Sequence, residues 1–544
     1  MTKSSNTDWL SILLGILATV KESIARWINP RDSAKTAAIM QVRKDLGIDG
    51  SRNERAATIE KLGGPGAQPL FTLPSGEVLC VRQAIIADGN HAFICGKTGS
   101  GKTFFTIYTI IDNNIEELLA GRRRCIVIDP KQETAVLLMR RLAAKFIRGD
   151  SHLRDELRQG VHAIVFRRGF VTPISPFVPN EHVSNAYLAE FLTDTMVRTS
   201  RTPVSITVAQ LLYYVIWLCI ELGIPLSVRF IRKFLRNAGY RQKILARIEN
   251  RDLRLFFETL SQTVAKQTID AVIRRFVSEV KFPENLAALG LPAEEIKKLG
   301  VPTDAPLTVA DFGASNILPP SIGLMHAEIF ATRTLLAAKG RDKRVPLQIV
   351  LEELPRLLDR SPQLTALVLD SLQTLRASRT SITMCAQRLD SLAREVVRDI
   401  ELNTSWITAF QSRADVGDLL VPYLSPVPGV SEAERRREFL RELGALPPQH
   451  AYFYVNGHAP FRVRSIDMIP PARIAGIPDD ELDDVFFREI TPRSTIAIDR
   501  ALAINAAWED EFVGDDESDS VKGKSEARGL DDLRSFLEGD DEDA

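Results

Sequence analysis

Hydrophobic residues follow two patterns along the chain, and together they predict a sheet flanked by helices. Short, almost wholly apolar runs are typical of buried strands, and the segments between them carry apolar residues every three or four positions, as helices do. Strands that alternate with helices pair in parallel, so the sequence predicts an α/β fold on a mostly parallel sheet. The predicted strands are residues 79–86, 92–95, 124–129, 307–312, 347–351, 381–386 and 406–410.

Other segments complete the predicted order. A hairpin around Asn456 and Gly457 closes the sheet with strands 452–455 and 461–466, and the periodicity fades beyond Pro471. Residues 181–299 have helical patterns throughout, which predicts an all-α domain inserted into the core or appended to it. The predicted organisation is an N-terminal amphipathic helix and linker (1–68), the first part of the core (69–180), the all-α domain (181–300), the second part of the core (301–470) and a C-terminal extension (471–544).

Two apolar segments raise the question of a membrane. Residues 202–220 carry no charge, but one crossing there would place the two parts of the core on opposite sides of a bilayer, so we expect a buried helix of a bundle. Residues 9–27 form an amphipathic helix whose uncharged stretch, between Asp8 and Lys21, is too short to span a bilayer. We predict no transmembrane helix; the N-terminal helix packs on its own body, docks on a partner or lies on a membrane surface.

Composition narrows the class of protein. The chain has 544 residues, 45% of them hydrophobic, which is enough for a soluble globular protein of several domains. Its five cysteines are scattered singly and its histidines are isolated, so neither a disulfide framework nor a zinc site is expected. The sequence therefore favours a cytoplasmic location.

Charge is distributed unevenly, although the net charge is only −1. Residues 509–544 hold 15 acidic and 4 basic residues, which predicts a disordered acidic tail. Residues 530–537 carry an apolar stripe. The tail is therefore either a peptide that docks on a partner or a tail without such a role. Residues 229–254 form the densest basic patch, interleaved with Phe230, Phe234 and Tyr240. Such a patch either binds the backbone of a nucleic acid or is a solvated helix face with its aromatic residues turned inward.

A glycine-rich loop joins predicted strand 92–95 to a helix. Glycines allow successive backbone N–H groups to face one anion, and the helix N-terminus adds its dipole. Lys102 would reach the β- and γ-phosphates and Thr103 would offer its hydroxyl to Mg²⁺, so the loop predicts an ATP or GTP site; a plain turn is the alternative. The loop residues are Gly96, Lys97, Thr98, Gly99, Ser100, Gly101, Lys102 and Thr103.

Polar residues end three of the predicted strands, and they indicate what the nucleotide is used for. Glu352 and Glu353 follow strand 347–351, Gln387 follows strand 381–386, and Gln411 follows strand 406–410. Hydrolysis needs one carboxylate for Mg²⁺ or its water shell and another that deprotonates the attacking water. We assign the metal role to Glu352, the base role to Glu353 and γ-phosphate sensing to Gln387; two solvated glutamates are the alternative.

Four segments in this order resemble the type IV secretion coupling proteins, the TraG/TraD-like conjugative transfer ATPases of the FtsK/HerA superfamily. They are GNHAFICGKTGSGKT, VIDPKQE, IVLEELPRL and LQTLRASRTSITMCAQRLDSL. The likeness covers about residues 79–466, including the position of the helical insertion. The DPKxE segment and the arginine-then-glutamine segment accompany the loop in that family and not in phosphate-loop proteins at large.

The resemblance implies a RecA-like motor domain that forms a homo-hexamer, uses ATP and Mg²⁺, and drives DNA through a central channel. It matches Gly96–Thr103 to the Walker A loop, Glu352 and Glu353 to the end of Walker B, and Gln387 to the sensor glutamine. Arg376 and Arg379 match the region of arginines that act in trans, and Arg376 is our choice. A relaxase, other secretion substrates and secretion-channel proteins are the implied partners.

Two departures from the family pattern leave alternatives open. Glu352 stands where the family usually has Asp. This difference affects the metal role assigned to Glu352 more than the base role assigned to Glu353. The family usually has two N-terminal transmembrane helices, and none is predicted here. The chain is then either recruited to the inner membrane periphery by its N-terminal helix, or it acts outside secretion. The alternatives are an ATP-dependent recruitment adaptor without motor action and a HerA-type packaging or end-processing translocase.

Overall fold

The computed structural model describes residues 59–514 apart from short gaps at 65–66, 87, 175–182, 200–202, 226, 281, 300–303, 314–316, 342–343, 360 and 427–428. The predicted N-terminal helix and the apolar stripe at residues 530–537 therefore lie outside the described residues.

A 13-stranded sheet runs through the core in the order β13-β6-β5-β7-β4-β8-β9-β3-β10-β11-β12-β1-β2. The strands from β5 to β10 in this order pair in parallel, and antiparallel strands extend both edges. This arrangement confirms the predicted α/β fold with a mostly parallel sheet. The strands are β1 (Ala67–Thr72), β2 (Val78–Arg82), β3 (Ala92–Cys95), β4 (Arg124–Asp129), β5 (Val161–Arg167), β6 (Phe170–Val171), β7 (Leu307–Asp311), β8 (Leu347–Leu351), β9 (Thr380–Ala386), β10 (Trp406–Phe410), β11 (His450–Val455), β12 (Phe461–Ser465) and β13 (Ile496–Ala497).

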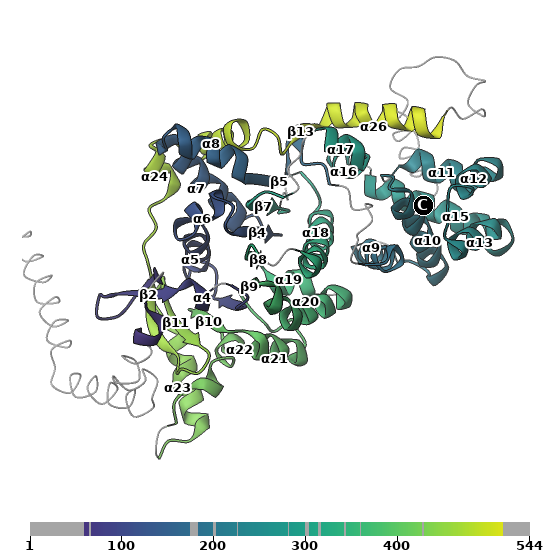
Figure 1. The fold of residues 1–544 in the computed structure, drawn as a ribbon. Coiled ribbons are helices and arrows are strands. Elements are labelled where there is room, and N and C mark those ends of the chain that lie inside the picture. The colour runs from purple at the N-terminus through teal and green to yellow at the C-terminus, as the bar shows by residue number, and fades with distance from the viewer. Residues whose placement is uncertain are drawn as a thin grey trace, which may run out of the picture.

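Helices cover both faces of the parallel strands, as their continuous apolar runs require. Alternate residues of β3 enter different cores: Phe93 and Cys95 belong to one, Ala92 and Ile94 to the other. Figure 1 shows the sheet between a group that contains α5 and α7 and a group that contains α18 and α20. The helices around the sheet are α4 (Gln83–Ile86), α5 (Lys102–Ile107), η1 (Tyr108–Asp112), α6 (Ile115–Leu119), α7 (Thr134–Arg148), α8 (Ser151–Gly160), α18 (Pro320–Gly340), α19 (Leu354–Leu358), α20 (Pro362–Thr374), η2 (Leu375–Ser378), α21 (Arg394–Asn403), α22 (Ala414–Gly417), η3 (Val421–Tyr423) and α23 (Glu432–Gly444).

The described elements between β6 and β7 are all helices, and most of them lie to one side of the sheet (Figure 1). The uncharged segment 202–220 falls mainly in α10, which packs against α9 and α15. Within the described ranges, every helix is too short or too polar to cross a bilayer. These helices are α9 (Asn185–Thr199), α10 (Ile206–Leu222), α11 (Val228–Arg236), α12 (Ala238–Leu245), α13 (Arg251–Glu258), α14 (Leu260–Thr263), α15 (Lys266–Val280), α16 (Pro283–Leu289) and α17 (Ala293–Lys298).

Three expectations from the sequence were wrong. Predicted strand 79–86 ends at Arg82, whose exposed guanidinium donates to the carbonyl of Lys61, and the chain turns into α4. Strand β5 was not predicted, although it lies in the parallel part of the sheet beside β7. The region beyond Pro471 is helical: α24 (Pro471–Ala475), α25 (Asp479–Val485), η4 (Phe486–Ile490) and α26 (Ile498–Val513).

Helix α26 also corrects the predicted start of the disordered tail. Glu509 lies inside this helix, and its carboxylate accepts a hydrogen bond from Ser227 of the helical region. The structured chain therefore continues at least to Gly514.

Candidate functional site

The glycine-rich loop is held from three neighbouring strands. The N–H of Gly96 donates to the carbonyl of Ala386 at the end of β9 (3.2 Å), and that of Lys97 donates to Gln411 after β10 (2.8 Å). The carbonyl of Ser100 accepts from the N–H of Gln449, just before β11 (2.7 Å). Because these bonds fix the backbone, the loop is preorganised for a ligand.

Two of the loop glycines cannot take a side chain without strain. A Cβ atom at Gly96 would lie 2.6 Å from Ser100 Oγ and 2.7 Å from Phe410 Cβ. Gly101 has a φ of 107°, in the region that favours glycine, and caps the N-terminus of α5. At these two glycines the loop therefore packs against its neighbours through backbone atoms alone. Its open side lies at the first turn of α5, where backbone N–H groups can bind a phosphate.

Lys102 lies between the two predicted carboxylates. Its Nζ is 3.4 Å from Oε2 of Glu352 and 4.0 Å from Oε1 of Glu353. Lys102 is 4% exposed and Glu352 is 2% exposed. Burial by itself would lower the pKa of Lys102, but the charges of Glu352 and Glu353 hold this pKa above its ordinary value. Lys102 is thus a buried ammonium that lies beside the two carboxylates at the end of β8.

Glu352 has one carboxylate oxygen in the ion pair and one without a hydrogen-bond partner. That second oxygen, Oε1, is buried. Burial raises the pKa of Glu352, the charge of Lys102 opposes this shift, and Asp129 adds to it. A buried oxygen with unused acceptor capacity fits the hard oxygen ligands that Mg²⁺ prefers.

The protein supplies few metal ligands of its own. Across the described part of the chain, His, Cys, Asp and Glu side chains form no group of three that could hold a metal ion. Mg²⁺ usually keeps several waters and binds through one or two protein oxygens together with substrate phosphates. The pair of Thr103 and Glu352 is consistent with that mode and not with a cage made only of protein groups.

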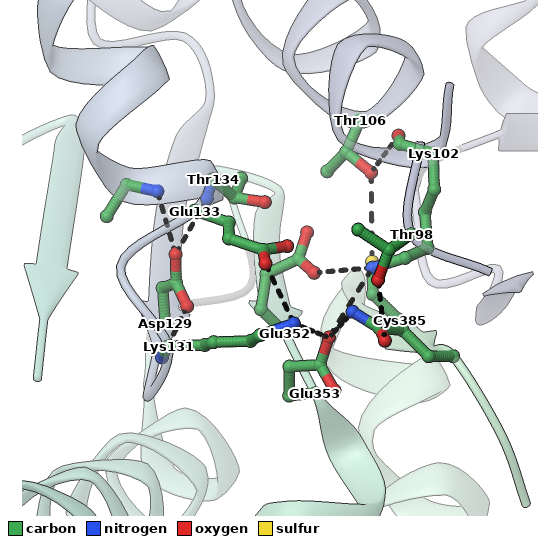
Figure 2. Close-up of polar contacts among 12 residues, drawn as sticks. Thr98, Lys102, Thr106, Asp129, Lys131, Glu133, Thr134, Glu352, Glu353 and Cys385 are labelled. Atoms are coloured by element: carbon green, nitrogen blue, oxygen red, sulfur yellow. Dashed lines mark hydrogen bonds and ion pairs between the residues drawn. The ribbon is translucent and has the colours of Figure 1, made fainter. Parts of the chain in front are cut away.

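Glu353 is held in an unusual backbone conformation and by a defined partner. Its φ of 49° and ψ of 47° are left-handed, which non-glycine residues adopt at a cost. Nε2 of Gln387 donates to its Oε1 at 2.7 Å, and the hydroxyl of Thr98 donates to Oε1 of Gln387 at 3.1 Å. Gln387 therefore connects the glycine-rich loop to Glu353. Figure 2 shows the two ends of this path, Thr98 and Glu353, close to Lys102.

The segment DPKQE contributes residues that sequence reasoning did not assign. Lys131 Nζ lies 2.7 Å from Oε1 of Glu133 and 3.8 Å from Oε1 of Glu353 (Figure 2). Asp129 shapes this segment, since its carboxylate accepts four backbone N–H bonds between residues 131 and 135. The signal was visible, because the segment begins at the last residue of a buried strand and carries two charges beyond it. Its position beside β8 was not visible in the sequence.

A second buried carboxylate lies behind that segment. Asp311, at the end of β7, accepts hydrogen bonds from the N–H of Gly313 (3.0 Å) and from Nε2 of Gln132 (3.1 Å). Burial and the charge of Asp129 raise the pKa of Asp311 to about 7, against the opposing effects of these bonds and of Arg167. Asp311 thus helps to hold the DPKQE turn and titrates near neutral pH.

We predict a pH-dependent effect for Asp311→Asn, which mimics the protonated carboxyl. Because its pKa is raised in the folded chain, protonated Asp311 contributes stability at acid pH that is lost as the pH rises through about 7. The variant lacks this loss, so its thermal midpoint should exceed that of the wild type at pH 8 more than at pH 5. Thermal unfolding at both pH values measures the difference. An equal difference at both would contradict the assignment.

Arg376 and Arg379 do not approach the loop of their own chain. They lie just before β9, whereas the loop lies beyond its carboxyl end. Arg376 donates to the carbonyl of Asn403, and Arg379 lies 3.7 Å from Oδ2 of Asp88. A seven-residue strand spans roughly 23 Å. A role at a nucleotide therefore requires a neighbouring copy of the chain, so the role predicted for Arg376 stays a prediction.

The basic patch at residues 229–254 is not one uniform face. Phe230 and Phe234 are buried, as in the alternative with inward aromatic residues. Arg241 is buried too and donates Nη1 to the carbonyls of Phe234 and Leu235, at the end of α11. Arg236 pairs with Asp270 at 2.8 Å. Arg241 is therefore a structural cap and is not available to phosphates.

Comparison with known proteins finds similarity in fold. No family model and no curated protein matches this sequence. The chain is similar to the bacterial conjugative coupling protein TrwB, with 14% identity over 76% of this chain and 91% of that chain, at a TM-score of 0.46. VirB4 of Thermoanaerobacter pseudethanolicus matches with 15% identity over 75% of this chain and 99% of that chain, at a TM-score of 0.47. The solved structures similar in fold to this chain thus include a conjugative coupling protein, the class that its motifs resemble.

Proposed function

We propose that the chain is an ATP-hydrolysing motor of the conjugative coupling type, which recruits DNA or a nucleoprotein and pumps it. One observation carries the hydrolytic part: Lys102 Nζ lies within 4.0 Å of both Glu352 and Glu353, and Gln387 joins Glu353 to the loop. This grouping has a phosphate-binding lysine, a metal-shell carboxylate and a base at the ends of adjacent parallel strands, where ligands bind in such sheets.

Each residue has a defined role in the proposed reaction. Lys102 turns its ammonium from the carboxylates toward the β- and γ-phosphates, and the loop N–H groups hold the same oxygens. Glu353 accepts a proton from the attacking water, whose oxygen bonds to the γ-phosphorus as the bond to the ADP oxygen breaks. Thr103 and Glu352 would hold Mg²⁺, which would supply positive charge to the phosphates. Gln387 orients Glu353 and senses the γ-phosphate through the loop.

Lys131 is a positioning residue in this scheme. Its ammonium, paired with Glu133, lies beside the same Glu353 oxygen that Gln387 contacts. Lys131 and Gln387 together thus hold the carboxylate of Glu353 in position beside the loop.

Assembly into a hexameric ring is part of the proposal. The support is that Arg376 and Arg379 lie far from their own loop, so a trans-acting arginine would come from the next copy. DNA in a central channel, a relaxase or other substrates, and contact with secretion-channel proteins at the inner membrane periphery belong to the same proposal.

The experiment is an ATPase assay with and without DNA, together with negative-stain imaging. We expect DNA to stimulate hydrolysis by the purified full chain, and rings to form with ATP and DNA. If DNA leaves the rate unchanged and no rings form, the motor proposal fails, and nucleotide-dependent binding of a protein substrate without motor action becomes the alternative to test. Lys102→Ala serves as the control for contaminating ATPases.

A further inference from the structure

The C-terminal end of α26 lies on the basic helices of the all-helical region (Figure 1). Asp510 pairs with Arg229. The carbonyl of Gly514 accepts hydrogen bonds from Arg229 Nη2 at 3.0 Å and from Lys233 Nζ at 3.3 Å, and Lys233 also donates to the carbonyl of Val513 at 3.0 Å. The chain therefore leaves the described structure beside α11, with its last carbonyl groups already bound by two cations.

Around this exit lies a set of cations that we name the basic face. The guanidinium of Arg247 lies 5.1 Å from the ring centre of Phe512. Lys243 is exposed and stands one turn of α12 after Tyr240, whose ring centre lies 5.2 Å from Lys233 Nζ. Within the described ranges, Lys243 forms no ion pair with an acidic side chain. The basic face comprises Arg229, Lys233, Lys243 and Arg247.

The sequence that follows Gly514 has the opposite charge. Residues 515–544 hold 12 acidic and 4 basic residues, and the first five are Asp-Asp-Glu-Ser-Asp. Five residues reach at most roughly 17 Å from Gly514. A tether this short gives the four leading carboxylates an effective concentration of about millimolar at the basic face. Charge and connectivity therefore favour the same contact.

We propose that the acidic segment 515–544 docks on the basic face of its own chain, led by residues 515–519. The docked segment continues the pattern that Asp510 and Gly514 begin, in which acidic and carbonyl oxygens cover the cations of α11. Other polyanions would compete with the docked segment for the same cations. That DNA is the competing polyanion rests on the proposed function, whereas the docking itself does not.

Zero-length carbodiimide cross-linking of the full chain, read by mass spectrometry, tests the contact. Cross-links from the acids of 515–519 to Lys243 are expected at low salt and should weaken at high salt, because such contacts are screened. Lys233 is the positive control, since it already contacts Gly514. If the Lys233 cross-link forms and the Lys243 cross-link does not, the proposal is overturned.

Isotope labelling decides whether the contact is made within one chain. Unlabelled and ¹⁵N-labelled protein are mixed under denaturing conditions, refolded together and cross-linked. Cross-links that join only peptides of the same label support docking within the chain. Cross-links that join peptides of different label place the segment on a second copy and overturn the assignment.

A binding measurement tests the competition, with heparin hexasaccharide as a probe that needs no motor activity. Neutralising the leading acids should raise probe affinity about tenfold at low salt. Neutralising four distal acids should have a smaller effect, because their tether is longer. Equal affinities for the wild type and the first variant would overturn the proposal. The first variant combines Asp515→Asn, Asp516→Asn, Glu517→Gln and Asp519→Asn; the second combines Asp540→Asn, Asp541→Asn, Glu542→Gln and Asp543→Asn.

A DNA oligonucleotide used with the same variants separates this inference from the proposed function. If heparin affinity rises in the first variant and DNA does not bind to any form of the protein, the docking stands and the DNA motor fails. If DNA binds and the affinity of neither probe changes, the motor proposal stands and the docking fails.

Discussion

Glu353→Gln is expected to lower kcat for ATP hydrolysis by about 10²–10⁴-fold, the usual contribution of a general base. The amide keeps the size of the side chain and its contact with Gln387, but it cannot accept a proton from water. Nucleotide binding should persist, because the loop and Lys102 hold the phosphates. Steady-state ATPase rates and equilibrium binding of a fluorescent nucleotide analogue measure the two effects separately.

Glu133→Gln is the matched control for that experiment. Glu133 belongs to the same group of charges and pairs with Lys131, but the structure gives it no direct contact with Gln387 or Lys102. We expect its kcat to stay within about fivefold of the wild type. If Glu133→Gln lowered kcat as much as Glu353→Gln, or if Glu353→Gln kept the wild-type rate, the base role would belong elsewhere.

Lys102→Ala is expected to abolish hydrolysis and also to destabilise the fold. The substitution leaves Glu352 as a buried carboxylate without its cation, and breaking a buried ion pair costs about 3–5 kcal/mol. Part of this loss is relieved if Glu352 binds a proton, which its raised pKa favours. Denaturant unfolding without nucleotide measures the free energy of unfolding.

The double variant Lys102→Ala with Glu352→Gln separates the two effects of that substitution. Removing both charges should restore most of the stability, because no unpaired charge remains buried. Hydrolysis should stay absent, since the phosphate-binding lysine is still missing. If the single variant is as stable as the wild type, the Lys102–Glu352 pair does not stabilise the fold. If the double variant hydrolyses ATP, Lys102 is not required.

Stability and catalysis are coupled at the Lys102–Glu352 ion pair. In the structure, Lys102 is held by the carboxylates that the proposed reaction needs for the metal ion and the base. Binding of phosphates therefore competes with internal ion pairs. The orphan oxygen of Glu352 and the strained backbone of Glu353 both lie at the same strand end, where such strain usually marks function.

The sequence by itself determined the elements whose signals are local. The strand from Ala92 to Cys95, the glycine loop after it and the acid pair after β8 could be identified because apolar runs and glycine spacing act within a few residues. Fold class followed from the same alternation of strands and helices. Strand β5 was missed although residues 161–166 are an almost wholly apolar run, and the end of β2 was misplaced, since a strand ends where its pairing with β1 ends and not where its apolar residues end.

Only the tertiary structure decided which side chains meet. Placing β9 between β8 and β3 brings Gln387 to both Glu353 and Thr98, and placing β4 beside β8 brings Lys131 to the same carboxylate. Long stretches of chain separate β3 and β4 from β8 and β9, and no local pattern records their order in the sheet. Arg241 also could not be assigned from the sequence, because it is buried by donating to the carbonyls of Phe234 and Leu235 at the end of α11. Residue type and spacing thus set the local chemistry, while long-range pairing and burial decided which of those charges face one another, a ligand or the protein interior.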